Sequence, residues 1–173
     1  MDEHYLMIGL RLLHILGGVF WVGSVAALAW FVLPAQQGLG ASGVTFMMDL
    51  MLRRKLRTYI GLAMMLTVLS GLAMYVRLSM VSDGAFSASR TGMTFGFGAM
   101  LAILAAGIGG GIAGRTGEKM AKLAVRIQEG GVPPTEDQRT EMTGLAARQG
   151  WALRTTAVLL FGSVAAMAIA RYL

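Results

Sequence analysis

The residue best suited to chemistry is His14, which lies inside the first long apolar stretch of the sequence. An ionisable side chain within a membrane span is costly, and its presence suggests a functional site. Nine residues separate it from Tyr5, which corresponds to a depth of about 14 Å in a helix. Two interpretations are open. The imidazole ligates a metal such as a haem iron, or it is a neutral histidine hydrogen-bonded to a neighbouring helix.

The residues one and two helical turns beyond His14 fit the first interpretation. Gly18 at i+4 leaves the face beside the imidazole without a side chain, and Trp21 follows on the same side at i+7. A flat ring such as haem b would approach there, with Arg11 near a propionate. The other histidine, His4, lies outside the stretch. A second axial ligand would come from another chain, be absent, or be a methionine, the candidates being Met64, Met65, Met93 and Met100.

A second group of cations precedes the second apolar stretch, in the run Arg53-Arg54-Lys55-Leu56-Arg57. Cations at this position bind anionic lipid headgroups. Arg54 and Arg57 would equally hold haem propionates or another acidic ligand. The alternative is a plain topological anchor, since Lys and Arg prefer the cytoplasmic side of a membrane.

Four stretches are apolar over the roughly 20 residues that a bilayer crossing requires, namely about 5–33, 59–78, 91–113 and 151–173. Each is expected to be a helix, because lipid does not tolerate unpaired backbone groups. Only 14% of the residues are charged, against about 25% in soluble domains. The sequence therefore predicts an all-α fold: one membrane domain, residues 1–173, built as a four-helix bundle.

Short amphipathic helices are expected in the two long connections, 35–56 and 114–150. Pro34 is expected to end the first span. Helical spacing of apolar residues predicts helices near 44–56 and 118–128. Thr135 is a predicted helix N-cap after two prolines, and residues 79–90 are predicted to form a short polar loop.

The basic residues divide unequally between the two sides of the predicted bundle. The long connections and their flanks carry eleven Lys and Arg, and the opposite side carries four, which are Arg11, Arg77, Arg90 and Arg171. Both termini are therefore expected outside the cytoplasm, in a bacterial inner membrane. Membrane topology also accounts for the net charge of +6, so no nucleic-acid partner is expected. The acidic start and the length of the first stretch predict a retained anchor.

The third stretch contains two overlapping pairs of glycines at the spacing that favours close helix contact. Gly107 pairs with Gly111, and Gly110 pairs with Gly114. These faces would pack within the bundle, or against a second copy or a partner subunit. A homo-oligomer or a partner in a membrane complex is therefore expected, in addition to lipid.

The composition excludes several kinds of chemistry. The chain has no cysteine, which rules out disulfides, thiolate metal sites and a cysteine nucleophile. None of the four stretches contains a carboxylate, which argues against an internal acid relay. These residues leave open whether the chain is an enzyme.

Two of the stretches carry recognisable patterns. The first has Leu13-His14 followed by Trp21-Val22-Gly23. The second is preceded by Arg53-Arg54 and Arg57 and continues with Met64, Thr67 and Gly71. In these patterns the chain resembles the membrane superfamily of CopD copper-resistance proteins and HemJ-type protoporphyrinogen oxidases.

The resemblance implies that His14 is the haem ligand of the first helix. HemJ-type enzymes pair this histidine with a lysine on the third helix, where the present chain has none. Two functions are expected as alternatives. One is a CopD/HemJ-like membrane protein binding b-type haem through His14 for electron transfer or oxidase-type chemistry. The other is a non-catalytic accessory subunit of a larger membrane complex.

Overall fold

The computed structural model describes residues 2–173, apart from the side chains of residues 2 and 41, and this part of the chain is helical with short turns. In chain order the elements are α1 (Asp2–Ala27), η1 (Leu28–Val32), α2 (Leu33–Gly38), α3 (Gly40–Met48), η2 (Asp49–Arg53), α4 (Leu56–Val81), α5 (Ala85–Ala88), α6 (Arg90–Ala106), η3 (Gly107–Ala113), α7 (Gly114–Glu129) and α8 (Glu136–Ala170), where η denotes a π-helical segment.

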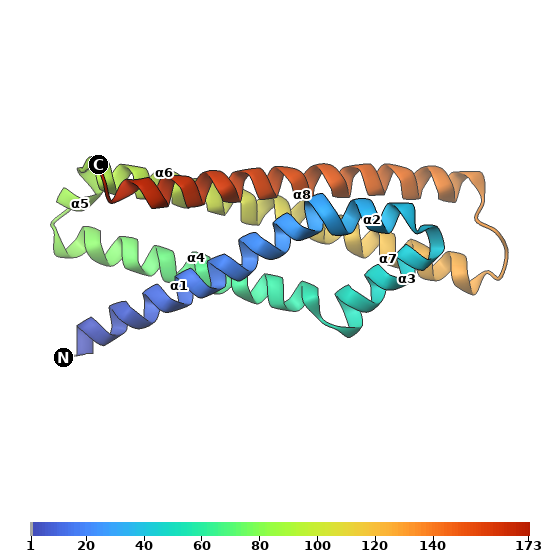
Figure 1. Ribbon diagram of the computed structural model, residues 1–173, viewed down its shortest axis with the longest axis horizontal. Helices are drawn as coiled ribbons and strands as arrows, with labels where there is room; N and C mark the ends of the chain where they lie inside the picture. The colour runs from blue at the N-terminus through green and yellow to red at the C-terminus, as the bar shows by residue number, and fades with distance from the viewer. Residues whose placement is uncertain (1) are drawn as a thin grey trace.

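Four continuous helical rods are long and apolar enough to cross a membrane: Glu3–Gly38, Leu56–Val81, Arg90–Glu129 and Glu136–Ala170. They lie side by side, with both chain termini at one end (Figure 1). We call this the terminal end, and we call the opposite end, which carries the α2–α3 and α7–α8 connections, the basic end. The all-α bundle of four membrane-type helices is confirmed.

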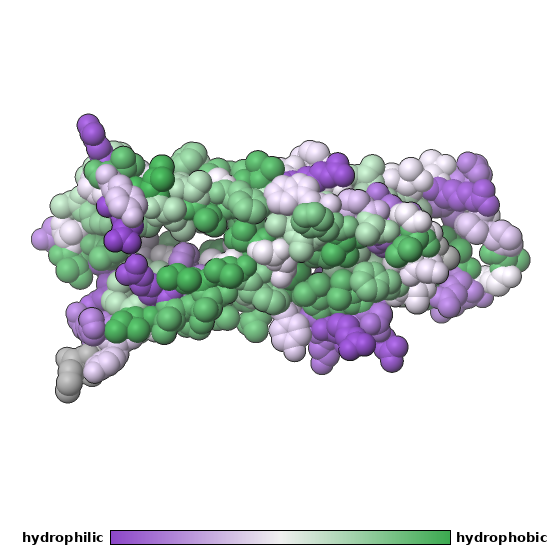
Figure 2. All heavy atoms as spheres, in the orientation of Figure 1, coloured by the Kyte–Doolittle hydropathy of each residue, from purple (hydrophilic) through white to green (hydrophobic). Residues whose placement is uncertain are grey.

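The rods associate mainly as two pairs, α1 with α4 and α6 with α8. Their outer surface is largely apolar between the terminal end and the turn that precedes α4, and polar residues gather at the terminal end and again near that turn and at the basic end (Figure 2). This distribution is the one expected when lipid is the solvent for the central band.

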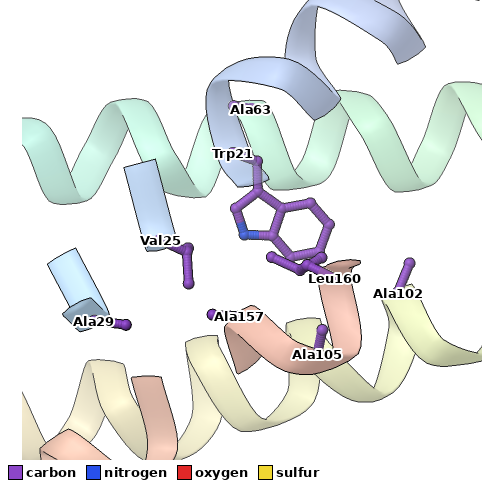
Figure 3. Close-up of a cluster of buried hydrophobic side chains, with 8 residues drawn as sticks. All are labelled: Trp21, Val25, Ala29, Ala63, Ala102, Ala105, Ala157 and Leu160. Atoms are coloured by element: carbon purple, nitrogen blue, oxygen red, sulfur yellow. The ribbon is translucent and has the colours of Figure 1, made fainter. Parts of the chain in front are cut away.

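The two pairs meet at a cluster in which Trp21, Leu160 and Val25 pack against five alanines (Figure 3). Trp21 of α1 is 2% exposed and lies between Leu160 and several alanines of the other three rods. Their members are Ala63 of α4, Ala102 and Ala105 of α6, and Ala157 and Leu160 of α8, with Val25 and Ala29 on the Trp21 side. Alanine allows the backbones to approach closely, and the indole fills the space between them.

A hydrogen bond reinforces the α6–α8 pair within the apolar band. The Ser163 hydroxyl donates to the carbonyl oxygen of Gly98 at 2.7 Å. A Cβ on Gly98 would lie 3.2 Å from the Ser163 carbonyl oxygen. Glycine at this position therefore permits the close contact that satisfies a buried hydroxyl.

The first rod does not end at Pro34, contrary to the sequence prediction, but continues through α2 to Gly38. Pro34 lies in the first turn of α2, where the missing backbone N–H is tolerated. The preceding π-helical segment, η1, changes the hydrogen-bond register just before the proline. Together these features allow the helix to pass through it.

The third rod also extends further than predicted, because α6, η3 and α7 form one continuous helix. The predicted helix near 118–128 is therefore the end of this rod rather than a separate piece. Glycines that would weaken a helix in water remain helical here, since lipid offers their backbone groups no other partner. In the predicted loop 79–90, α4 continues to Val81 and α5 occupies Ala85–Ala88.

Thr135 caps α8 as predicted. Its hydroxyl accepts a hydrogen bond from the Gln138 backbone, and the Gln138 side chain accepts one from the Thr135 backbone. The predicted helix near 44–56 is present as α3 followed by η2, and it begins four residues earlier and ends at Arg53. The chain then turns at Lys55, which has a φ of 57°, before α4 begins.

Candidate functional site

His14 lies in the contact between α1 and α4. Its Nδ1 donates a hydrogen bond to the Thr67 carbonyl oxygen at 2.8 Å, since a carbonyl only accepts. In a neutral ring the lone pair is then on Nε2, for which the described residues provide no hydrogen-bond partner. Histidines that ligate metals usually donate their other N–H to a carbonyl or carboxylate in this way.

Glycines on both helices make this contact possible. A Cβ on Gly71 would lie 2.7 Å from His14 Cε1, so the imidazole rests directly on the α4 backbone. A Cβ on Gly17 would lie 2.8 Å from Thr67 Oγ1, and one on Gly18 would lie 3.5 Å from the Thr67 methyl group. The open face expected beside His14 at Gly18 is therefore occupied by Thr67.

The remaining predicted site residues are spread over the bundle. Trp21 lies in the central cluster, and Arg11 is exposed. Arg54 pairs with Asp49 at 3.2 Å outside the bundle. Arg57 lies in the first turn of α4, ten residues before Thr67 and about 15 Å from it along the helix. The structure therefore separates Arg54 and Arg57 from His14. Of the methionines considered as a second ligand, Met64 contacts the Gly110 region, whereas Met65, Met93 and Met100 are exposed.

A cavity of about 660 Å³ lies between the rods toward the basic end. Trp21, Val25 and Met64 line its deep part, and Arg57, Glu118 and Gln149 line the part nearer the loops. Along the third rod it runs from Gly109 to Val125, a length of about 24 Å. Most of its walls are apolar side chains and glycines.

Methionine is prominent in these walls, with Met47, Met48, Met51, Met64, Met120 and Met142 all lining the cavity. The flexible thioether chain adapts to ligands of different shape and contacts aromatic rings favourably. All three π-helical segments of the described chain also contribute, through Leu28 of η1, Met51 of η2 and Gly110 of η3. Such segments are rare and occur frequently at functional sites.

Three charged side chains form the rim of the cavity. Glu118 of α7 pairs with Lys122 at 2.8 Å and with Arg57 of α4 at 3.7 Å. All three side chains are about half exposed or more, so solvent reaches this part of the wall. The rim thus joins the start of α4 to α7 and carries a net charge of +1.

Gln149 of α8 supplies a polar group inside the wall. Its side-chain amide lies against α7, where Nε2 would be 3.4 Å from a Cβ on Gly117. Its Oε1 is buried and has no hydrogen-bond partner among the described residues. Sequence reasoning did not select Gln149, because a glutamine in a polar connection carries no signal of burial.

The two glycine pairs of the third rod face different surroundings. Gly110 and Gly114 line the cavity, whereas a Cβ on Gly107 or Gly111 would meet no atom within 4 Å. The Gly107–Gly111 face is therefore unfilled by this chain. The expectation of an oligomer or a partner subunit stays a prediction.

Comparison of the chain with family models, curated proteins and solved structures finds no match. The resemblance to CopD and HemJ-type proteins thus remains a prediction from the sequence patterns. The candidate site rests on the geometry above.

Proposed function

We propose that this chain is an integral membrane protein that binds an amphipathic small molecule in the cavity at its basic end. The observation that carries the proposal is a cavity of about 660 Å³ with apolar walls and a charged rim. Binding sites for small molecules typically have volumes of about 300–1,000 Å³, apolar linings and a few convergent polar groups.

The distribution of polarity along the cavity favours an amphipathic ligand. The deep part is lined by apolar side chains such as Trp21 and Met64, whereas Arg57 and Glu118 at the rim are charged and about half exposed. A ligand would place its apolar part toward the bundle centre and its polar head toward the rim. In this orientation no polar group of the ligand is buried among apolar side chains without a hydrogen bond.

Trp21 provides the assay. It is 2% exposed and lines the cavity, whereas Trp30 and Trp151 are 42% and 55% exposed. In nanodiscs of the Trp30→Phe, Trp151→Phe variant, the tryptophan fluorescence of the chain comes from Trp21 alone. A bromoundecanol probe with bromine at its tail end is expected to quench this fluorescence saturably.

A matched pair of glycine substitutions tests where the probe binds. Gly110→Leu fills the cavity, since a Cβ there meets only Met64 Cε at 3.9 Å. It should weaken binding of the probe by about five- to 150-fold, because forcing two groups into one space costs about 1–3 kcal/mol. Gly107→Leu, on the same segment but outside the cavity lining, should leave quenching unchanged. Equal quenching in both variants would overturn the proposal.

A second candidate function is b-haem binding through His14, as the CopD/HemJ-like resemblance implies. The hydrogen bond from Nδ1 to the Thr67 carbonyl supports it, because this bond leaves Nε2 as the ligating atom. The donor fits an iron atom, but the surface beside Gly18 does not fit a flat ring, because Thr67 fills it. Haem would supply electron-transfer chemistry, and His14 would be the residue of the chain that holds its iron.

An ultraviolet–visible spectrum tests the haem candidate. Protein purified from haem-replete cells should show a Soret band that is absent in His14→Ala. A colourless preparation would exclude it.

We also propose that both termini lie outside the cytoplasm of a bacterial cell, in its inner membrane. The excess of Lys and Arg at the basic end supports this orientation. The native chain has no cysteine, so single substitutions give clean labelling sites. With a membrane-impermeant maleimide on intact spheroplasts, Asp83→Cys should react and Gly131→Cys should not.

A further inference from the structure

The turn between η2 and α4 carries three consecutive cations, Arg53, Arg54 and Lys55. The side chains of the two arginines are 86% and 76% exposed, and Lys55 is exposed as well. Asp49 pairs with both arginines, at 3.6 Å and 3.2 Å. Three cations and one carboxylate leave this turn with a net charge of +2.

The pairing with Asp49 leaves donors for a second anion. Arg53 meets the carboxylate through Nη1 and Arg54 meets it through Nε. A guanidinium has five N–H donors in a planar fork that matches the oxygens of a phosphate. Each arginine therefore retains other N–H groups that a phosphate would accept from, and the ammonium of Lys55 follows directly in the chain.

The length of α4 places this turn at the level of lipid headgroups. α4 has 26 residues, which corresponds to about 39 Å. A bilayer is about 40–45 Å thick when its headgroup regions are included. With the Val81 end of α4 in one headgroup region, the turn before α4 therefore lies in the other.

The residues around the turn suit the boundary between lipid and water. Phe46 of α3 and Leu52 of η2 are large apolar side chains that remain exposed. Tyr59 is exposed one helical turn into α4, where its backbone N–H donates to the carbonyl oxygen of Lys55. Tyrosine is enriched at this boundary, and exposed apolar groups beside cations are typical of helices that lie in it. Hydrophilic side chains protrude at the turn, next to apolar surface (Figure 2).

We propose that the turn between η2 and α4 binds the headgroup of an anionic phospholipid, with Arg53, Arg54 and Lys55 in contact with its phosphate. Cations close to a bilayer surface attract anionic lipids. The exposed apolar neighbours favour a lipid over a soluble anion, since acyl chains would cover them. These three cations are not part of the cavity lining, so the lipid at the turn is additional to the ligand of the cavity.

Spin-labelled lipids measure the preference beside the turn. The chain has no cysteine, so Tyr59→Cys provides a single site for a bimane fluorophore. Nanodiscs of phosphatidylcholine would contain a small fraction of phosphatidylglycerol or of phosphatidylcholine, each with the same nitroxide near the top of one acyl chain. The association constant from quenching should be at least about fivefold larger for phosphatidylglycerol, the factor that one cation near an anionic layer contributes.

The other end of the same helix provides the control site. Val81 is the last residue of α4 and is exposed. Arg77, one turn before it, is paired with Glu3. Bimane on Val81→Cys should therefore be quenched equally by the two lipids.

Two triple substitutions with the same change in net charge assign the preference to the turn. Arg53→Gln, Arg54→Gln, Lys55→Gln should abolish it, and the exposure of these side chains means that no packing is lost. The matched control neutralises three exposed cations of α7 and α8 and should retain the preference. It consists of Lys119→Gln, Arg126→Gln and Arg139→Gln.

A single substitution should act in the opposite direction. Asp49→Asn removes the carboxylate that offsets part of the positive charge, so the preference for phosphatidylglycerol should increase. A decrease would contradict the proposal.

Three further outcomes would overturn it. Equal association of the two lipids beside Tyr59 would show that the turn does not select an anionic headgroup. An equal loss in both triple variants, or a loss in neither, would show that the preference does not arise at the turn. Displacement of the lipid by an excess of soluble glycerol phosphate would assign the turn to a soluble anion instead.

Discussion

The α1–α4 crossing and the cavity both depend on glycine, with opposite results. At the crossing, the space left by Gly17 and Gly71 is filled by Thr67 and His14 of the facing helices. At the cavity, a Cβ on Gly61 would meet nothing within 4 Å, and one on Gly110 would meet only the end of Met64. Glycine therefore provides close packing where a facing side chain enters, and volume where none does.

The largest effect is expected from adding a methyl group to each kind of glycine on the same helix. Gly71→Ala would place Cβ 2.7 Å from the imidazole and should destabilise the protein by about 1–3 kcal/mol through overpacking. Gly61→Ala, facing the cavity, should be neutral or stabilising, because alanine favours helix by up to about 1 kcal/mol. Thermal unfolding in nanodiscs measures both.

A double mutant sharpens this contrast. In the Gly71→Ala background, His14→Ala removes the ring that the new methyl group meets, and it should restore part of the lost stability. Purely additive losses would show that the ring does not lie against Gly71.

Filling the cavity should affect stability in the opposite direction. Gly110→Leu is expected to stabilise the protein by about 0.5–2 kcal/mol, as cavity-filling substitutions commonly do. Gly107→Leu gains the same helix propensity without filling the cavity and is the reference. A Gly110→Leu protein less stable than Gly107→Leu would mean that the walls close in the membrane.

The hydrogen bond from His14 to the Thr67 carbonyl is expected to stabilise the protein less than the packing of the α1–α4 crossing does. His14→Phe keeps an aromatic ring and removes the donor to the Thr67 carbonyl, so a loss of about 0.5–1.5 kcal/mol is expected. His4→Phe, at an exposed position of α1, should not change the unfolding midpoint. Equal effects of the two substitutions would contradict the placement of His14.

The smallest effect is expected at the rim of the cavity. Glu118→Gln removes the carboxylate shared by Arg57 and Lys122, but exposed ion pairs contribute little. The unfolding midpoint should therefore stay unchanged at both low and high salt. A salt-dependent decrease in the midpoint would show that the rim holds α4 against α7.

Local signals in the sequence were sufficient to predict those elements whose structure is determined by their own residues. The apolar stretches predicted the four rods, and Thr135 predicted the start of α8, because hydropathy and capping act over a few residues. The prediction that the first span ends at Pro34 was wrong, because the helix tolerates this proline through the π-helical turn before it. Hydropathy does not reveal that change of hydrogen-bond register.

The site was less predictable because it depends on contacts between distant segments. The depth of His14 followed from the sequence, but its partner Thr67 did not. Gln149 was missed because its burial arises only when α7 and α8 lie together. The glycine pairs of the third stretch looked alike in sequence, and only the facing residues distinguish Gly110 from Gly107.

The π-helical segment η3 determines where the third rod can lose a residue without turning the side chains that follow. A π turn contains one residue more than an α turn, and one residue corresponds to about 100° of rotation in an α-helix. Deleting a single glycine from Gly109–Gly111 would remove that extra residue, so the segment would become α-helix and α7 would keep nearly its present orientation. Glu118 and Lys122 would still face Arg57. Deleting one residue from the α-helical part just before Glu118 would instead turn both side chains by about 100° and take them out of reach of Arg57.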